Sequence, residues 1–157
     1  MEYVTSTGNG GSCIFCELLA RDDDVGAHIL FRDESAFVLL NAFPYNTGHL
    51  MVAPSRHVAN LRDLEPAELS ALMELTSRSV DIVQVAMSPQ GFNVGMNLGA
   101  VAGAGVPGHL HVHVVPRWGG DTNFMTVVGD TKVLPEMLAD TDAKLRPGFS
   151  ALRQDGR

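Results

Sequence analysis

The chain of 157 residues has the size of one ordinary domain, and its 45% of hydrophobic residues can build a single core without disulfides. Its formal net charge of -7 disfavours nucleic acid and anionic membranes as partners, because Lys and Arg supply most of the attraction to both. Local hydrogen-bond donors can still hold a small phosphate ester. No apolar run reaches the ~20 residues that cross a bilayer, and the polar residues 1–12 lack the pattern of a signal peptide, so we expect a cytoplasmic protein.

The first half of the chain predicts a short helix followed by an antiparallel meander of strands. Residues 14–20 can form a helical turn. Two short apolar runs, Ile29–Arg32 and Ala36–Leu40, are separated by polar residues and predict a β-hairpin. Turn-forming residues fill positions 41–48, and a third strand is predicted at residues 49–53.

The longest predicted helix covers residues 66–86. Pro66 suits the first helical position, and the acidic side chains of Glu65 and Glu68 favour the positive end of the helix. Apolar and small side chains recur at helical spacing and should form one stripe against the sheet. These residues are Leu69, Leu72, Met73, Thr76, Val80 and Val83.

The second half predicts two more strands around a glycine-rich loop. A fourth strand is expected at residues 92–97, the loop at 98–108, and a fifth strand at 110–115 that ends at Pro116. A weaker helical pattern covers residues 132–145, after which Pro147 and Gly148 begin a polar tail. This order of elements predicts an α+β domain with a mainly antiparallel sheet.

Three histidines, His109, His111 and His113, alternate with aliphatic residues in the predicted fifth strand. Because successive side chains of a strand point to opposite faces, the three imidazoles should share one face at intervals of ~6.6 Å. A lone strand histidine is most often structural, but three in register indicate imidazole chemistry. A metal site is the alternative for one of them only, because three ligands along one strand are too linear to close a tetrahedron.

The glycine-rich loop leads directly into these histidines. Glycine lets the backbone approach a ligand closely, and consecutive free N–H groups form an anion-binding concavity. Such a loop alone is as often a flexible connection, but beside a row of imidazoles it predicts a phosphate cradle. A neutral imidazole is a good nucleophile at pH 7, and the phosphoramidate that it forms can be discharged by water or by inorganic phosphate.

The two cysteines, Cys13 and Cys16, form a Cys-x-x-Cys pair. A structural disulfide is not expected in the reducing cytosol, which leaves metal binding, free buried thiols or redox chemistry. The redox interpretation is the weakest, because no thioredoxin-like βαβ pattern follows the pair.

The segment from His109 to Val115 matches the His-φ-His-φ-His-φ-φ signature of the histidine triad (HIT) superfamily, in which φ is apolar. The resemblance covers nearly the whole chain and includes residues 41–54, which are similar to the family's nucleoside-binding hairpin. Residues 113–124 look most similar to the branch of bacterial diadenosine tetraphosphate phosphorylases and fragile-histidine-triad hydrolases. The resemblance implies a HIT-like domain at 13–147 with a five-stranded sheet, one long helix and one or two shorter ones, between a flexible N-terminus (1–12) and a polar tail (148–157).

Family roles carried over to this sequence give three histidines a part in catalysis. His111 corresponds to the nucleophile that attacks the α-phosphorus and becomes a nucleotidyl-histidine. His113 resembles the partner that contacts the phosphate and the leaving oxygen, and His49 resembles the histidine that supports it.

The resemblance also implies the nucleotide contacts. Asn41 matches the side chain that binds ribose hydroxyls, and Asn97 stands where the family often has a polar phosphate contact. Gly105 and Val106 belong to the phosphate loop. Val106 departs from the family pattern, which commonly has Ser or Thr there, so a hydroxyl contact is missing although the backbone N–H is retained.

Some relatives hold a structural zinc ion with a Cys-x-x-Cys pair, a histidine after the hairpin and the first triad histidine. The matching residues here are Cys13, Cys16, His57 and His109. Zinc bound by them would pin the N-terminal segment to the catalytic strand, and no organic cofactor is expected.

The resemblance implies an enzyme, a nucleotidyl hydrolase or transferase that cleaves dinucleoside polyphosphates, with diadenosine tetraphosphate favoured and water or phosphate as acceptor. Hydrolysis of nucleoside phosphoramidates through the same histidine, or nucleotide sensing with negligible turnover, are the alternatives. The expected partner is a small nucleotide, and the two-fold dimers of the family imply a homodimer, with a tetramer left open.

Overall fold

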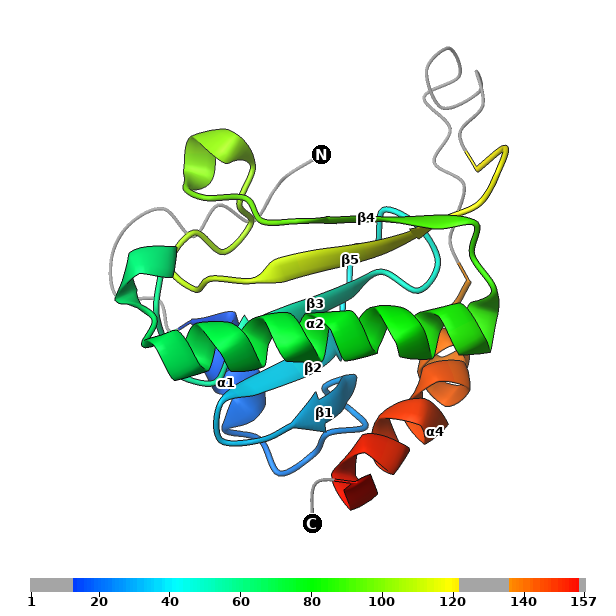
Figure 1. The fold of residues 1–157 in the computed structure, drawn as a ribbon, viewed down its shortest axis with the longest axis horizontal. Helices are drawn as coiled ribbons and strands as arrows, with labels where there is room; N and C mark the ends of the chain where they lie inside the picture. Colours follow the sequence, from blue (N-terminus) through cyan, green and yellow to red (C-terminus); the bar gives the residue numbers. More distant parts are fainter. Residues whose placement is uncertain (1–12, 122–135, 156–157) are drawn as a thin grey trace.

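The computed structural model describes residues 13–121 and 136–155. Within them lies a five-stranded antiparallel sheet with the strand order β1-β2-β3-β5-β4 (Figure 1). The strands are β1 (Ile29–Arg32), β2 (Ala36–Leu40), β3 (Leu50–Pro54), β4 (Gly91–Gly95) and β5 (Val112–Arg117). The predicted α+β class and mainly antiparallel sheet are confirmed, whereas the predicted flexible N-terminus lies outside the described residues.

The predicted bounds of the strands next to the histidines were wrong by one or two residues. β3 begins after His49, and β5 begins at Val112, so that His109 and His111 precede the ladder and only His113 lies within it. β5 also continues through Pro116, because β3 pairs with β5 only as far as Val114 while β4 pairs beyond it. Proline is tolerated where a strand needs hydrogen bonds on one side only.

Both faces of the central strands are covered. On one face, Val38, Val52 and Val114 pack against α2 (Pro66–Met87) and α4 (Leu138–Asp155). On the other face, side chains such as Phe37 and Met51 pack around Phe15 of the short helix α1 (Ile14–Leu19). Figure 1 shows α2 running alongside the strands over the middle of the sheet, where it contacts β2, β3 and β5, while α1 lies near β2.

Helix α2 starts as predicted but turns a different side to the core. Pro66 is its first residue, and Glu65 and Glu68 form a reciprocal capping box. Leu69 and Met73, which we expected to be buried, are 39% and 45% exposed, whereas the unpredicted Leu75 and Ser79 are buried, together with Leu72, Thr76 and Val83. The buried stripe is therefore rotated toward α4, which contacts α2.

The expected end of the last helix and the polar tail after it were wrong. Residues 132–135 lie outside the described part, and α4 runs from Leu138 to Asp155 with Pro147 inside it. Phe149 is fully buried, one turn after the fully buried Leu145. Gly148 lies so close to α2 that an added Cβ would come within 2.6 Å of the Ile82 side chain, so the glycine permits close helix packing instead of ending the helix.

None of the helices in the described ranges is both long enough and apolar enough to cross a membrane.

Candidate active site and metal centre

Five of the six histidines of the chain lie close together along the side of the sheet where Phe15 packs. The ring centroids of His49 and His113 are 5.1 Å apart, and those of His113 and His111 are 4.9 Å apart. Phe15 lies edge-on between His111 and His109, at 5.2 and 5.3 Å. The predicted common face of the triad is confirmed, and it now includes His49 and His57 from outside the motif.

Hydrogen bonds fix which nitrogen of His111 carries the proton. Its Nδ1 lies 2.8 Å from the carbonyl oxygen of His109, which can only accept, so Nδ1 carries the proton. In the neutral ring Nε2 therefore carries the lone pair. The ring is 4% exposed, and no bond to its Nε2 occurs among the described residues. His111 thus has the protonation state that a nucleophile requires.

A chain of hydrogen bonds gives His113 the opposite polarity. The backbone N–H of Tyr45 donates to Nδ1 of His49 at 3.1 Å, so His49 carries its proton on Nε2. That nitrogen lies 2.9 Å from Nδ1 of His113 and donates to it. His113 is left with an N–H at Nε2, which is buried and has no partner in the described part of the chain. A buried donor without a partner is costly, and an acceptor on a ligand would satisfy it.

Burial keeps these rings neutral. It lowers the pKa of His111, and it lowers the pKa of His113 to about 4 with a further contribution from His111. The pKa of His49 falls to about 3, first because of burial and then because of the charges that His113 and His111 would carry. All three imidazoles are therefore uncharged at neutral pH.

The hairpin between β2 and β3 brings Asn41 to the edge of this site. The side-chain oxygen of Asn41 accepts a hydrogen bond from the Phe43 N–H at 2.9 Å, and its backbone N–H donates to the His49 carbonyl. Its amide nitrogen lies 3.4 Å from Nδ1 of His49. The ring of Tyr45 is tilted against the ring of His49, with centroids 4.8 Å apart, and Tyr45 is 64% exposed.

The glycine-rich loop joins β4 to the segment that carries the triad histidines. Gly99 and Gly103 have φ of 85° and 88°, which glycine adopts without strain, and Asn97 donates to the Gly103 carbonyl at 3.3 Å. The N–H groups of Gly105 and Val106 donate to no backbone carbonyl among the residues described. The Val106 side chain packs against the Phe15 cluster, so the valine that replaces the expected Ser or Thr contributes apolar packing.

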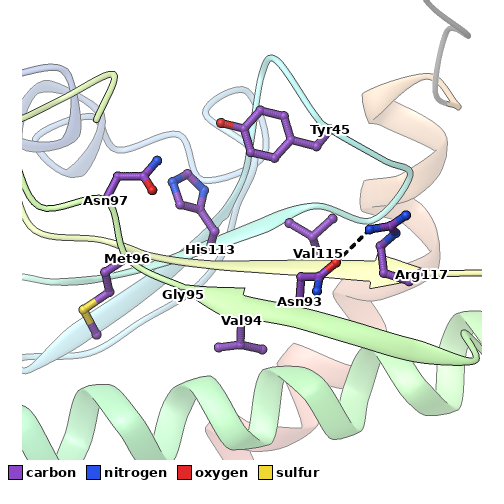
Figure 2. A pocket seen from close by; sticks show the side chains of 9 residues that line it. All are labelled: Tyr45, Asn93, Val94, Gly95, Met96, Asn97, His113, Val115 and Arg117. Carbon is purple, nitrogen blue, oxygen red and sulfur yellow. Dashed lines mark hydrogen bonds between the residues drawn. The ribbon is translucent and has the colours of Figure 1, made fainter. Parts of the chain in front are cut away.

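A cavity of about 310 Å³ opens beside His113. Figure 2 shows Asn97 and His113 at one end, Tyr45 on one wall, and Asn93 and Arg117 at the other end. Sequence reasoning missed Tyr45 and Asn93. Strand alternation could have indicated Asn93, because residues 93, 95 and 97 share one face, but no local pattern links Tyr45 to His113.

Cys13, Cys16, His57 and His109 form a second cluster, as predicted. Their four ligand atoms all lie within 4.8 Å of one another. Nδ1 of His109 is 3.3 Å from the Cys13 sulfur and 3.7 Å from the Cys16 sulfur, which is itself 3.4 Å from Nδ1 of His57. Tetrahedral zinc, with bonds of about 2.3 Å to sulfur and about 2.0 Å to nitrogen, separates its ligand atoms by about 3.5 Å. The donor set and its spacing therefore fit zinc.

The tautomer of His109 suits this cluster. Its Nε2 lies 2.8 Å from the carbonyl oxygen of Pro54 and must donate to it, which leaves the lone pair on Nδ1, the atom that faces the sulfurs. Such a second hydrogen bond is how proteins orient metal-binding histidines. The ring of His109 thus belongs to the Cys/His cluster, while its carbonyl orients His111.

The HIT domain family model matches residues 23–120. AP-4-A phosphorylase of Mycobacterium tuberculosis is 46% identical over 127 residues, which are 81% of this chain and 65% of that protein. This chain thus covers slightly less than two thirds of that relative's length. An asymmetrical bis(5'-nucleosyl)-tetraphosphatase of Schizosaccharomyces pombe is 34% identical over 93 residues, 59% of this chain and 50% of that protein.

Solved structures share the fold. A zinc-bound histidine triad family protein from Mycobacterium smegmatis superimposes with a TM-score of 0.70 at 24% identity, over 92% of this chain and 97% of that one. A hypothetical histidine triad nucleotide-binding protein from Sulfolobus tokodaii gives 0.69 at 23% identity, over 91% and 95%.

Proposed function

The chain belongs to the histidine triad (HIT) family, and on that premise we propose that it is an enzyme that cleaves dinucleoside polyphosphates, diadenosine tetraphosphate above all. One observation carries the proposal. The ring of His111, with its unprotonated Nε2, lies 4.9 Å between centroids from the ring of His113, whose Nε2–H has no partner among the described residues. The names of the M. tuberculosis and S. pombe relatives support this class of substrate.

The reaction proceeds in two displacements. The lone pair of His111 Nε2 attacks the α-phosphorus, and the bond from that phosphorus to the bridging oxygen breaks. The rest of the substrate leaves with the electron pair, and His113 donates its hydrogen bond to the bridging oxygen. Water or inorganic phosphate then attacks the nucleotidyl group on His111, and the phosphorus–nitrogen bond breaks to restore the free imidazole.

His49 acts on His113 and not on the substrate. Because its Nε2–H donates to Nδ1 of His113, it keeps the other nitrogen of His113 as the donor. The backbone N–H of Tyr45 holds His49 in the tautomer that this requires.

Backbone and amide groups hold the nucleotide. The N–H groups of Gly105 and Val106 and the amide of Asn97 bind the non-bridging oxygens, where charge develops during phosphoryl transfer. Asn41, which lies beside His49, binds the ribose hydroxyls.

The nucleophile gives the decisive experiment. Wild-type protein incubated with diadenosine tetraphosphate should release AMP and ATP without inorganic phosphate, or ADP and ATP with it, and the products identify the acceptor. His111→Asn keeps a donor for the His109 carbonyl but has no nucleophile, so turnover should fall by at least ~10³-fold with nucleotide affinity retained.

Other outcomes select the alternatives. Turnover of a nucleoside phosphoramidate but not of diadenosine tetraphosphate would indicate a phosphoramidate hydrolase. Nucleotide binding without turnover in the wild type would indicate a sensor, and activity that survives in His111→Asn would refute the mechanism.

We also propose that the Cys13 cluster holds one structural zinc ion, which when bound supplies a covalent cross-link between distant segments. It would fix α1, and with it Phe15, against the segment that carries His109 and His111. Support comes from the ligand spacing and from the zinc-bound M. smegmatis protein.

A homodimer is proposed as the assembly. β4 is an edge strand of the sheet, and its Val94 is 48% exposed. Leu69 and Met73 of α2 are also exposed. Edge strands and exposed apolar side chains are features that proteins usually cover, and a second copy would cover them.

A further inference from the structure

The cavity beside His113 continues along β4 and β5 as far as Arg117. His113, Val115 and Arg117 share one face of β5, and Asn93 and Gly95 lie opposite Val115 and His113 on β4. At ~3.3 Å per residue, Arg117 lies about 13 Å along the strand from His113. Figure 2 shows the side chains of His113, Val115 and Arg117 following one another along this trough.

The far end of the trough is polar, and its cation, Arg117, is paired with a carboxylate. Nε and Nη2 of Arg117 donate to the two carboxylate oxygens of Asp121 at 2.7 and 2.8 Å, and Nη1 donates to the side-chain oxygen of Asn93 at 2.8 Å. The guanidinium keeps the pKa of Asp121 low, at about 2, so the pair remains a salt bridge at neutral pH. A phosphate would meet a cation that is already neutralised there.

The remaining groups suit an uncharged ring system. With its oxygen engaged by Arg117, Asn93 has its NH₂ group left to donate. The exposed ring of Tyr45 forms one wall, Val115 lies between, and Gly95 leaves open space, because an added Cβ there would meet nothing within 4 Å. Aromatic rings bind nucleobases by stacking, largely irrespective of the base.

We propose that this trough binds the second nucleoside of a dinucleoside polyphosphate, the one that departs with the leaving nucleotide. The inference rests on the proposed function. The polyphosphate arm spans the distance from His113, Tyr45 stacks against the base, and the Asn93 amide, held by Arg117, donates to it. The trough therefore selects substrates with a nucleoside at both ends.

Three substrates with the same nucleotidyl group separate the contributions. They are diadenosine tetraphosphate, adenosine tetraphosphate, which lacks the second nucleoside, and adenosine phosphoramidate, which has a small leaving group. Asn93→Leu should lower kcat/KM for diadenosine tetraphosphate about tenfold, mainly through KM, and leave the other two unchanged. Asn60→Leu, the same change at an exposed asparagine bonded to Asp63, should alter none of them.

The other possible results on these substrates test the proposal as follows. An equal loss on diadenosine tetraphosphate and adenosine tetraphosphate would place phosphate in the trough and overturn the proposal, as would no loss on either. An equal loss on all three would show that Asn93→Leu disturbs the histidines, and Asn93→Gln, which keeps the amide, must then restore selectivity for the proposal to stand. Absence of turnover in the wild type would refute the proposed function itself.

Discussion

Acidification should destabilise the protein through the buried imidazole pair of His49 and His113. Their pKa values are lowered from the ordinary 6.5 to about 3 and about 4. Above pH 6.5 both rings are neutral whether the chain is folded or not, so they add no pH dependence. Below it the unfolded chain binds protons that the folded chain excludes, so stability falls until pH passes the folded-state values.

The size of the effect follows from the shifts. pH 5 lies 1.5 units below the ordinary value and above both folded-state values, which at ~1.36 kcal/mol per unit gives about 2 kcal/mol for each histidine. Between pH 7.5 and pH 5 the pair should therefore lower the free energy of unfolding by about 4 kcal/mol.

His49→Gln isolates one half of this loss. Urea unfolding of wild type and variant at pH 7.5 and pH 5 should show a decrease about 2 kcal/mol smaller in the variant, with equal m-values. Comparing the two proteins cancels the contributions of the other histidines. Between pH 7.5 and pH 9 the change in the free energy of unfolding should be the same in both. Identical decreases in both proteins would mean that His49 is not excluded from protonation and would refute the reasoning.

Two further predictions concern the metal cluster and the assembly. Metal analysis of purified protein should find about one zinc per chain. Cys16→Ser should lower both the zinc content and the melting temperature, since the free energy of metal binding contributes to folding in such sites. Wild-type protein without zinc would contradict the proposed zinc site. Light scattering should give twice the mass of one chain, with Val94→Lys shifting it toward the monomer, and a monomeric wild type would contradict the dimer.

Local patterns were sufficient for the order of elements and for most of the histidine site. The alternation of His109, His111 and His113 with aliphatic residues puts the imidazoles on one face in any extended backbone. Pro66 and its flanking acids mark the start of α2 for equally local reasons. The four proposed metal ligands were identified through the resemblance, and the structure brings them together.

Features that depend on packing were not predictable in this way. Leu69 and Leu72 fit a helical stripe equally well, and how α2 packs on the sheet and α4 decides which of them is buried. Pro147 and Gly148 are helix-ending residues by local preference, but burial of Phe149 and close contact with Ile82 outweigh that preference.

The sequence by itself determined which residues carry imidazole and thiol groups, and that the triad shares a face, because strand periodicity is a property of neighbouring residues. The tertiary structure alone decided how those groups are protonated and what surrounds them. The tautomer of His113 depends on His49, 64 positions away, and the trough joins Asn93 of one strand to Arg117 of the next. Hydrogen bonds between residues so far apart exist only after the chain has folded, so no local pattern encodes them.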